Sequence, residues 1–321
     1  MKVLYIIDPI DTNTETITFY LNIFKKIQKF LPGKFFYSSL EYNKSVNEYY
    51  SDCFNNNLDE NYNKKFKKEL SFYESYELII TNSGNYIIRE IFDFVINVTI
   101  GIYSRPPFNY SIQLDPWGIF WKSYTYNAPR LNIKKNYDLA FEFRKNLNLE
   151  NQIKEFSLFA FNSEYWPLKI QNLPKTQVEY FYNFYKENSN VIWTKKPNVI
   201  SFGINHNFDY EYFKNMPKEN LVSMDSSLLI PKCKKIWATH SSLGFQGALF
   251  GVEIESPSCF YYWKNEQIGT IGHLLETVWL SDFSKIENRI DKLKIKMPKN
   301  FKENTLNLYT YLNDNTNFYR I

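Results

Sequence analysis

Short apolar runs recur along the first third of the chain, and a polar turn or a helix-like segment follows each of them. Residues 3–7, 77–81 and 98–103 have the pattern of strands that are buried on both faces. Residues 14–30 and 86–94 show the apolar spacing of amphipathic helices. Strands that alternate with helices in this way predict an α/β domain with a mostly parallel sheet.

A second series of strands and helices follows an aromatic, helical segment at 131–186. Its predicted strands are 198–203, 221–224, 236–239 and 252–254. The pattern from 286 to 321 is helical again. We therefore expect two α/β domains and a C-terminal helical return. The expected ranges are 1–190 for the first domain, 191–285 for the second, and 286–321 for helices that pack back on the N-terminal half.

Composition and charge narrow the function classes. The 321 residues suit two domains, and a hydrophobic content of 44% is ample for their cores. Aromatic residues make up 19%, for which compositional bias is a simpler explanation than a binding surface. The net charge of +4 is spread along the chain without the basic and aromatic interleaving of a nucleic-acid surface, so we expect no nucleic-acid partner. Lysines are densest at 64–68 and 292–299, and we expect each group to be the solvated face of a helix rather than a surface that binds an anionic membrane.

The cysteines and the lengths of the apolar runs indicate the cellular compartment in which we expect the protein. Cys53, Cys233 and Cys259 are far apart and form no metal-binding motif, which indicates a reducing environment. The first apolar run is too short for a signal peptide, and no stretch approaches the ~20 apolar residues of a membrane span. We therefore expect a cytoplasmic protein.

The stretch with the most chemical content is 235-KIWATHSSLGFQGALFGVEI-254, in which a predicted strand ends at a polar turn and a helix follows. The free N–H groups and the positive end of the macrodipole make a helix N-terminus favourable for phosphate or carboxylate. The structural alternative is that Ser242 is an ordinary helix cap. The residues that we assign to this anion site are His240, Ser241, Ser242, Gly244 and Gln246.

Two further loops carry candidate groups for chemistry. Asp115 follows a strand end in 113-QLDPWGIFWKSY-124, where its carboxylate can act as general acid or base. An Asx-type turn over Trp117 and Gly118 is the structural alternative. Arg105 can clamp a carboxylate or phosphate with its guanidinium, and a purely structural role is equally open.

Past the strand predicted at 198–203, the chain places His206 and Asp209 at the rim where open α/β sheets bind ligands. The alternative is a polar loop in which Asp209 caps the next helix. Asp225 and Ser226 repeat the pattern of a strand followed by a helix cap, and carry the same alternative.

Missing motifs exclude several classes. The chain has no Asp-x-Asp, which weakens the case for a metal-dependent transferase. It also lacks GxGxxG, GxxxxGK[ST] and GxSxG, the signatures of dinucleotide-binding proteins, P-loop proteins and α/β-hydrolases. We expect neither a metal nor a cofactor.

Residues 236-IWATHSSLGFQGALFG-251 resemble the donor-site motif of two-domain GT-B glycosyltransferases that build bacterial capsule and lipopolysaccharide, and most closely the group of the β-Kdo transferases. The run 115-DPWGIFWKS-123 is similar to the acidic-Gly-Phe-x-basic-Ser loop of their N-terminal domain, with extra residues around Gly118. The resemblance covers residues 97–124 and 198–255, and it implies a fold of two Rossmann-like domains with a central cleft.

The resemblance implies transfer of a sugar, in the first place Kdo, from a CMP-activated donor to a surface glycan. It implies that Asp115 is the general acid/base and that the nucleotide phosphate binds at His240–Ser242 without a metal. For a retaining reaction it implies a carboxylate nucleophile, with Asp209 as first and Asp225 as second candidate. The implied partners are a nucleotide-sugar donor and a glycan or glycolipid acceptor.

Several alternatives stay open. The donor can be CMP-sialic acid, a UDP-sugar or a GDP-sugar, and the outcome at the anomeric carbon can be retention or inversion. The chain can also be a non-catalytic nucleotide-binding protein of glycan assembly. A location at the cytoplasmic face of the inner membrane, with other glycan-assembly proteins, is an alternative to a freely cytoplasmic one.

Overall fold

The computed structural model describes thirteen parts of the chain: 1–7, 14–38, 40, 52–53, 58–100, 111–118, 123–128, 133–146, 153–161, 174–195, 214–239, 242–256 and 268–296. The chain divides into two compact units. Unit 1 comprises Met1–Gly101, Ser111–Thr125 and Thr277–Ile321, and unit 2 comprises Ile102–Tyr110 and Tyr126–Glu276. Residues 126–190, which the sequence pattern assigned to the first domain, therefore belong to the second unit.

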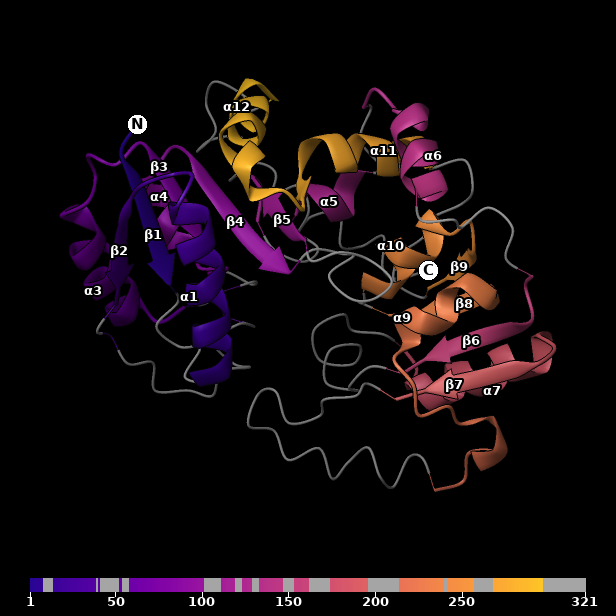
Figure 1. Cartoon of the computed structure of the whole chain (residues 1–321). Helices are drawn as coiled ribbons and strands as arrows, with labels where there is room; N and C mark the ends of the chain where they lie inside the picture. Colours follow the sequence, from indigo (N-terminus) through magenta and orange to yellow (C-terminus); the bar gives the residue numbers. More distant parts are fainter. Residues whose placement is uncertain are drawn as a thin grey trace. The chain divides into compact units, whose positions relative to one another are not determined.

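Unit 1 contains a six-stranded sheet in the order β10-β5-β4-β3-β1-β2 (Figure 1). Its strands are β1 (Val3–Ile7), β2 (Lys34–Tyr37), β3 (Leu78–Thr81), β4 (Val95–Ile100), β5 (Ile112–Asp115) and β10 (Trp279–Leu280). The strands β2, β1, β3 and β4 are parallel, whereas β5 and β10 are antiparallel to their neighbours. The helices described in this unit are α1 (Thr14–Gln28), α3 (Glu60–Ser71), α4 (Ile87–Ile91) and α12 (Ile286–Lys296), with the short helix η8 (Phe283–Lys285) before α12.

The central strands of unit 1 are buried on both faces because their side chains are continuously apolar. Every residue of β1 and β3 is buried. Tyr62, Phe66 and Leu70 lie on one face of α3 and belong to the core cluster that includes Leu4 and Ile79. The helix α3 begins at a cap, where Asp59 Oδ1 accepts a hydrogen bond from Tyr62 N at 3.0 Å.

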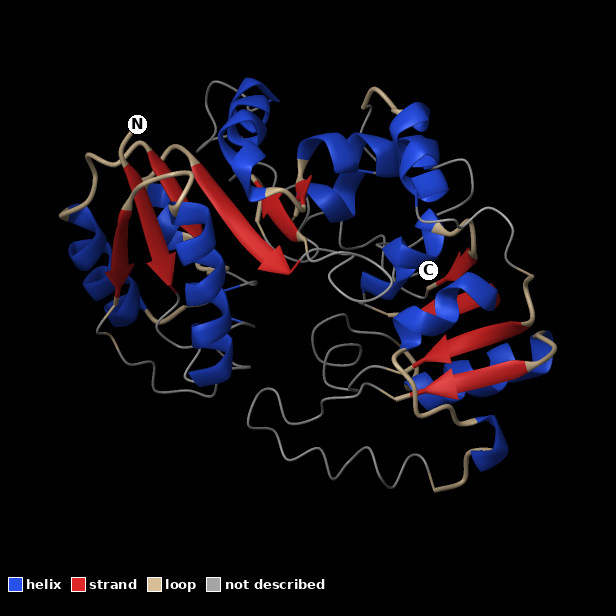
Figure 2. Cartoon of the chain, in the orientation of Figure 1, coloured by secondary structure: helices blue, strands red, loops and turns tan. Residues whose placement is uncertain are grey.

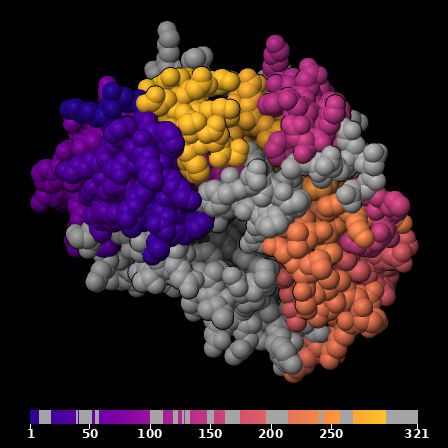
Figure 3. Space-filling view, in the orientation of Figure 1, coloured from indigo at the N-terminus to yellow at the C-terminus, as the bar shows by residue number. Residues whose placement is uncertain are grey.

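The last described helix packs against the start of the chain. Lys294 Nζ of α12 donates to Met1 Sδ at 3.1 Å and lies 5.4 Å from the ring centroid of Phe94. Figure 3 shows α12, in yellow, beside the indigo surface of unit 1. Residues 279–296 thus complete the first unit, although they follow the second one in the sequence.

Unit 2 contains a four-stranded parallel sheet in the order β7-β6-β8-β9. Its strands are β6 (Phe156–Ala160), β7 (Val191–Thr194), β8 (Cys233–Ala238) and β9 (Glu253–Glu255). Figure 2 shows helices packed beside the strands in this unit. The longer described helices are α6 (Tyr137–Asn146), α7 (Gln177–Glu187), α10 (Ser242–Leu249) and α11 (Ile268–Thr277). Its described short helices are α9 (Ser226–Leu229), η4 (Lys218–Asn220) and η5 (Ile230–Lys232), whereas α5 (Tyr124–Asn127) begins in unit 1 and ends in unit 2.

Helices cover opposite faces of the second sheet. On one face, the rings of Phe159 and Trp237 stack with centroids 3.9 Å apart, and Phe181 of α7 packs edge-on to Phe159 at 5.3 Å. On the other face, α10 approaches so closely that a Cβ on Gly247 would lie 2.9 Å from Ile236 Cδ1. This arrangement is expected, because right-handed crossovers that leave a parallel sheet in opposite directions cover its two faces.

The four parallel strands have the same spatial order in both units. When the strands of each unit are counted along the chain, the second lies at the margin, followed by the first, the third and the fourth. The order is β2-β1-β3-β4 in unit 1 and β7-β6-β8-β9 in unit 2. This is the doubly wound arrangement, so the predicted α/β class with two Rossmann-like domains is confirmed.

Several local predictions need correction. Residues 156–160 form the strand β6 within the segment predicted to be helical. The predicted strand at 221–224 is absent, and Leu221 makes only an isolated bridge with Trp193. The strand predicted at 198–203 lies outside the described residues. Cys53 and Cys233 are buried, and neither takes part in a disulfide.

Candidate functional site

The strand and the helix predicted on either side of residue 240 are present in unit 2. The strand β8 ends at Ala238, Thr239 follows, and α10 begins at Ser242. Gly251, with φ +68°, ends the helical segment in the left-handed conformation that glycine adopts without strain. His240 and Ser241 lie outside the described residues, so their contribution to an anion site stays a prediction.

The carboxyl end of β8 lies at the topological switch point of its sheet. The chain leaves β6 in one direction to form β7 and later forms β8 on the other side of β6. The connections after β6 and β8 therefore diverge to opposite faces of the sheet. In doubly wound sheets this divergence opens a crevice at the carboxyl ends of the two strands, where such folds bind their ligands.

A buried hydroxyl lies at this edge. Thr239 is 0% exposed, and its Oγ1 has no hydrogen-bond partner among the described residues. A buried hydroxyl without a partner costs about 1–3 kcal/mol, so it is ordinarily matched by a neighbouring group. Gly244 and Gln246 are buried within α10, and the exposed fraction of Gln246 is 2%.

Asp225 and Ser226 lie at the same edge of the sheet. Ser226 Oγ is 2.6 Å from the Oγ1 of Thr194, the last residue of β7. Asp225 caps α9, and its Oδ1 accepts hydrogen bonds from Ser227 N at 3.0 Å and Ser227 Oγ at 2.8 Å. The helix α9 contacts α10. The structure therefore gives Asp225 the capping role that the sequence left open, and it adds Thr194 to the polar groups of this edge.

Asp115, the predicted general acid/base, lies in unit 1 at the end of β5 and is 0% exposed. Its Oδ1 accepts hydrogen bonds from the backbone N–H groups of Trp117 at 3.0 Å, Gly118 at 3.4 Å and Tyr124 at 2.8 Å. Its Oδ2 accepts from Thr125 N at 3.0 Å and Gln113 Nε2 at 3.1 Å. One carboxylate thus organises both ends of the loop between β5 and α5.

These contacts correspond to the Asx-type turn that was the structural alternative for Asp115. Burial raises the pKa of the Asp115 carboxyl, and the hydrogen bonds from Thr125, Tyr124 and Trp117 act in the opposite direction. Both oxygens are engaged inside the protein. A role in proton transfer would therefore require this loop to open.

A second polar network connects the strand ends of the first sheet. The guanidinium of Arg89 donates to Asn97 Oδ1 and, at 2.7 Å, to Pro116 O. Asn97 Nδ2 donates to Ser83 O at 2.5 Å. Arg89 is buried in α4, and the sequence prediction did not single it out, although an arginine that directly follows two isoleucines in a short helix is a recognisable signal.

The remaining predicted site residues, Arg105, His206 and Asp209, lie outside the described residues. Within the described ranges, no group of three or more His, Cys, Asp or Glu side chains could hold a metal ion. In the same part of the chain, the helices are too short or too polar to cross a lipid bilayer.

No protein-family model and no curated protein sequence matches the chain. Solved structures with a similar fold include KpsC of Thermosulfurimonas dismutans, a β-Kdo 2,7-transferase, with 13% identity, 79% of this chain and 78% of that chain covered, and a TM-score of 0.44. The UDP-GlcNAc 2-epimerase of Neisseria meningitidis shares 10% identity over 98% of this chain and 99% of that one, with a TM-score of 0.35. The ADP-heptose heptosyltransferase II of E. coli shares 11% over 80% and 86%, with a TM-score of 0.25.

Proposed function

We propose that the chain is a glycosyltransferase whose second unit binds a nucleotide-sugar donor, with Kdo from a CMP-activated donor as the first candidate, and that it transfers the sugar to a bacterial surface glycan. The observation that carries this proposal is the place of Thr239 and Ser242. Thr239 follows the end of β8, and Ser242 begins α10, at the switch point of a doubly wound sheet. The proposal rests on this chain's own residues and on the sequence motif described above.

Sugar transfer from a CMP-activated donor needs a site that stabilises negative charge on the leaving group. As the bond between the sugar's anomeric carbon and the phosphate oxygen breaks, negative charge develops on the departing CMP. The N-terminus of α10 supplies backbone N–H donors and the positive end of a helix dipole for that phosphate. His240 and Ser241 would add donors, and Thr239 would position the turn. Preorganised donors of this kind stabilise a leaving group without a metal ion.

Two carboxylates, those of Asp209 and Asp115, have proposed roles in the reaction. Asp209 remains the proposed nucleophile of a retaining reaction. Asp115 is proposed as general acid/base only from the sequence motif, because in the structure its carboxylate holds the loop after β5. Arg105, Asp225, Ser226, Ser242, Gly244 and Gln246 are the residues proposed to surround the donor. The acceptor is a glycan or glycolipid.

A nucleotide panel tests the donor. CMP should raise the thermal midpoint of the protein more than UDP, GDP or ADP at equal concentration, because a ligand that binds only the folded state stabilises it. His240→Ala should reduce transfer from CMP-Kdo by about 100-fold, the usual loss when one donor to the developing charge is removed. Glu142→Ala, on the exposed face of α6, is the control and should leave transfer unchanged.

Two results would count against the proposal. Equal shifts with all four nucleotides would remove the CMP specificity, and normal transfer by His240→Ala would remove the phosphate site. Binding of CMP without any transfer or donor hydrolysis would instead support a nucleotide-binding protein of glycan assembly.

A further inference from the structure

The helix α3 of unit 1 carries a row of lysines that ends at an aromatic residue. Lys64, Lys68 and Phe72 are spaced four residues apart, and Lys65 lies three residues before Lys68. In an α-helix, side chains at i, i+3 and i+4 share one face. Phe72 follows α3 and keeps a helical backbone, with φ −67° and ψ −10°. These four residues therefore lie on one side of the helix, and we name them the basic face of α3.

The basic face points away from the core. Tyr62, Phe66 and Leu70 pack the opposite side of α3 against the first sheet. The three lysines are exposed, and Phe72 is 79% exposed, more than any other large hydrophobic side chain in the described part of the chain. In Figure 1, α3 is the helix at the left margin of unit 1. A single exposed ring is common on proteins, and it is informative here because it ends a row of cations.

The lysines of the basic face are available to a partner. Within the described ranges, Lys64, Lys65 and Lys68 take part in no ion pair. Lys67, which lies off the basic face, is paired with Glu90 of α4. The helix thus separates one lysine that is used inside the unit from three whose charges face solvent. The sequence pattern predicts only that these lysines are solvated, and the exposed ring beside them is what indicates a partner.

The acidic side chains of α3 have places of their own. Glu69 Oε2 accepts a hydrogen bond from Ser38 Oγ at 2.6 Å, on the side of the helix next to β2. Glu60 lies in the first turn, where a carboxylate is favourable at the positive end of the helix dipole. It precedes Lys64 by one turn and forms no ion pair with it. The basic face itself contains no carboxylate.

The surroundings of the ring are charged but balanced. Lys34 Nζ of β2 lies 5.1 Å from the ring centroid of Tyr73, the residue after Phe72, and so places a further cation near the end of α3. Glu74 follows Tyr73 and is exposed. One cation and one carboxylate flank the ring in this way, so the three lysines of the helix determine the sign of the surface.

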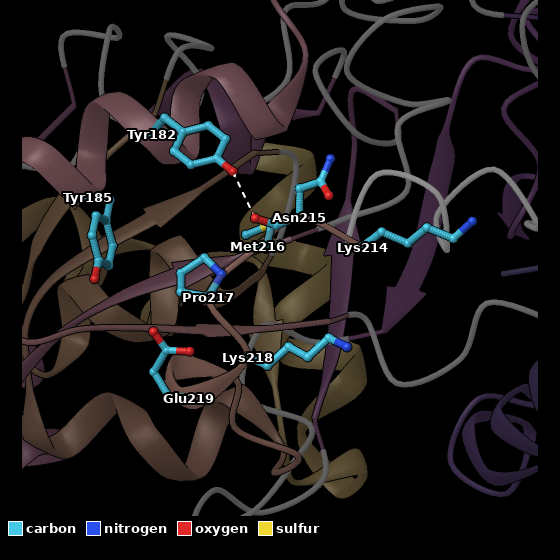
Figure 4. Close-up of a pocket in the computed structure, with 8 residues that line it drawn as sticks. All are labelled: Tyr182, Tyr185, Lys214, Asn215, Met216, Pro217, Lys218 and Glu219. Atoms are coloured by element: carbon cyan, nitrogen blue, oxygen red, sulfur yellow. Dashed lines mark hydrogen bonds between the residues drawn. The ribbon is translucent and has the colours of Figure 1, made fainter.

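A pocket of about 500 Å³ in unit 2 shows a different arrangement of lysines and aromatic rings (Figure 4). It lies between α7 and the turn before η4, and Tyr182 and Tyr185 of α7 line it. The ammonium groups of Lys214 and Lys218 point away from these rings. Glu219 is the charged group beside Tyr185. Cations and rings thus face different directions in this pocket, whereas on α3 they share one face.

Cations along a convex helix with an apolar ring at one end fit an anionic lipid bilayer. Each lysine near an anionic surface strengthens binding about fivefold. An aromatic ring on the same face enters the boundary between headgroups and acyl chains. A nucleic acid is a poorer match, because its single strands bind in basic grooves that contain several stacking rings.

We propose that the basic face of α3 binds a bilayer of anionic phospholipids, with Lys64, Lys65 and Lys68 at the headgroups and Phe72 inserted below them. This attachment goes beyond the proposed sugar transfer. Every residue that it uses belongs to unit 1, so it does not depend on the donor site of unit 2.

Flotation of the full chain with lipid vesicles tests this attachment. The chain should bind vesicles of equal parts phosphatidylglycerol and phosphatidylcholine. It should bind vesicles of phosphatidylcholine alone at least about tenfold more weakly, because their surface has no net charge. Salt at about 1 M reduces the screening length to about 3 Å, so binding to the anionic vesicles should be largely lost.

Variants of the basic face locate the contact. Lys64→Gln combined with Lys68→Gln should weaken binding to anionic vesicles about 25-fold, which is fivefold for each charge. Phe72→Ala should weaken it about fivefold. Phe72→Leu should bind like the unmodified chain, since insertion requires apolar area rather than an aromatic ring. The substituted side chains are exposed, so circular dichroism should show an unchanged fold.

Lys25→Gln combined with Lys29→Gln is the matched control and should leave vesicle binding unchanged. These two lysines are exposed and have the same spacing of four residues, in α1 and just after it. Phe24 of α1 contacts Tyr5, whereas α3 packs in the cluster that contains Leu4. Neighbouring residues of a strand point to opposite faces of the sheet, so α1 and α3 cover opposite faces.

Several results would overturn the attachment. Absent binding to anionic vesicles, or an equal loss in the control pair, removes the basic face as the site. Equal binding to pure phosphatidylcholine removes the anionic class. Binding of a single-stranded oligonucleotide, without binding of vesicles, indicates a nucleic-acid surface instead. CMP should bind equally to all these variants. Loss of CMP binding in the unmodified chain would therefore contradict the donor site and leave the vesicle result unaffected.

Discussion

At the scale of single residues, a side chain's surroundings decide its role more than its chemical type does. Asp115 and Asp225 both follow the end of a predicted strand, and both were candidates for chemistry on that ground. In the structure each carboxylate accepts hydrogen bonds from its own loop, at Trp117 and Ser227 among others. Aspartate is common at such positions because its oxygens satisfy backbone N–H groups that would otherwise lack a partner.

Replacement of Asp115 by asparagine separates a structural role from a catalytic one. The amide would turn an N–H₂ group toward backbone donors, so Asp115→Asn should lower the free energy of unfolding by about 2–4 kcal/mol. Urea denaturation followed by tryptophan fluorescence measures the change. Asp291→Asn on the exposed face of α12 is the control and should be neutral. Unchanged stability with lost transfer would instead support proton transfer by Asp115.

At the scale of elements, close approach between segments depends on glycines whose partners are remote in sequence. Along α11, Gly272 faces Asn136, whose carbonyl oxygen would lie 1.6 Å from an added Cβ. Asn136 N also donates to Gly269 O at 2.8 Å. The start of α6 and the helix α11 thus pack backbone against backbone. The sequence shows both glycines, but not what lies against them.

This contact predicts a large cost for one added methyl group. Gly272→Ala should destabilise the protein by roughly 2–4 kcal/mol, because backbone rather than a flexible side chain must move. Thermal denaturation measured by circular dichroism would detect the lower midpoint. Glu142→Ala on the exposed face of α6 serves as control. A wild-type midpoint for Gly272→Ala would contradict the close approach.

At the scale of the whole molecule, two units with the same strand order have different proposed tasks. Unit 2 carries the proposed nucleotide site at β8 and α10. Unit 1 is interrupted in sequence, because residues 277–321 return to it after the second unit. Donor binding should therefore slow amide exchange mainly in the second unit.

Hydrogen–deuterium exchange tests this division. CMP should slow amide exchange in the peptides that contain 233–249, because bound ligand suppresses local opening around its site. Exchange in β1, β3 and β4 should change much less. Protection confined to those strands of unit 1 would contradict the assignment of the donor site to unit 2.

Much of the fold is readable from local pattern. The strand Val3–Ile7 was predicted to the residue, since continuous apolar runs mark buried strands, and the helix predicted to follow the strand before residue 240 is present as α10. The strand β6 was missed because FSLFA lies among helical aromatic segments, and a five-residue apolar run does not distinguish a strand from a helix. The candidate site was less predictable, since Thr194 becomes part of it only through its contact with Ser226.

The amino-acid sequence by itself determined the α/β class, the strand, turn and helix around residue 240, and the short list of polar groups that follow strand ends. These depend on neighbours along the chain. Only the tertiary structure decided the strand order that puts Thr239 at a switch point, the burial of Asp115 and the placing of Tyr182 and Tyr185 beside residues 214–219. The physical reason is that these properties depend on which distant segments pair and pack, and local periodicity carries no record of that choice.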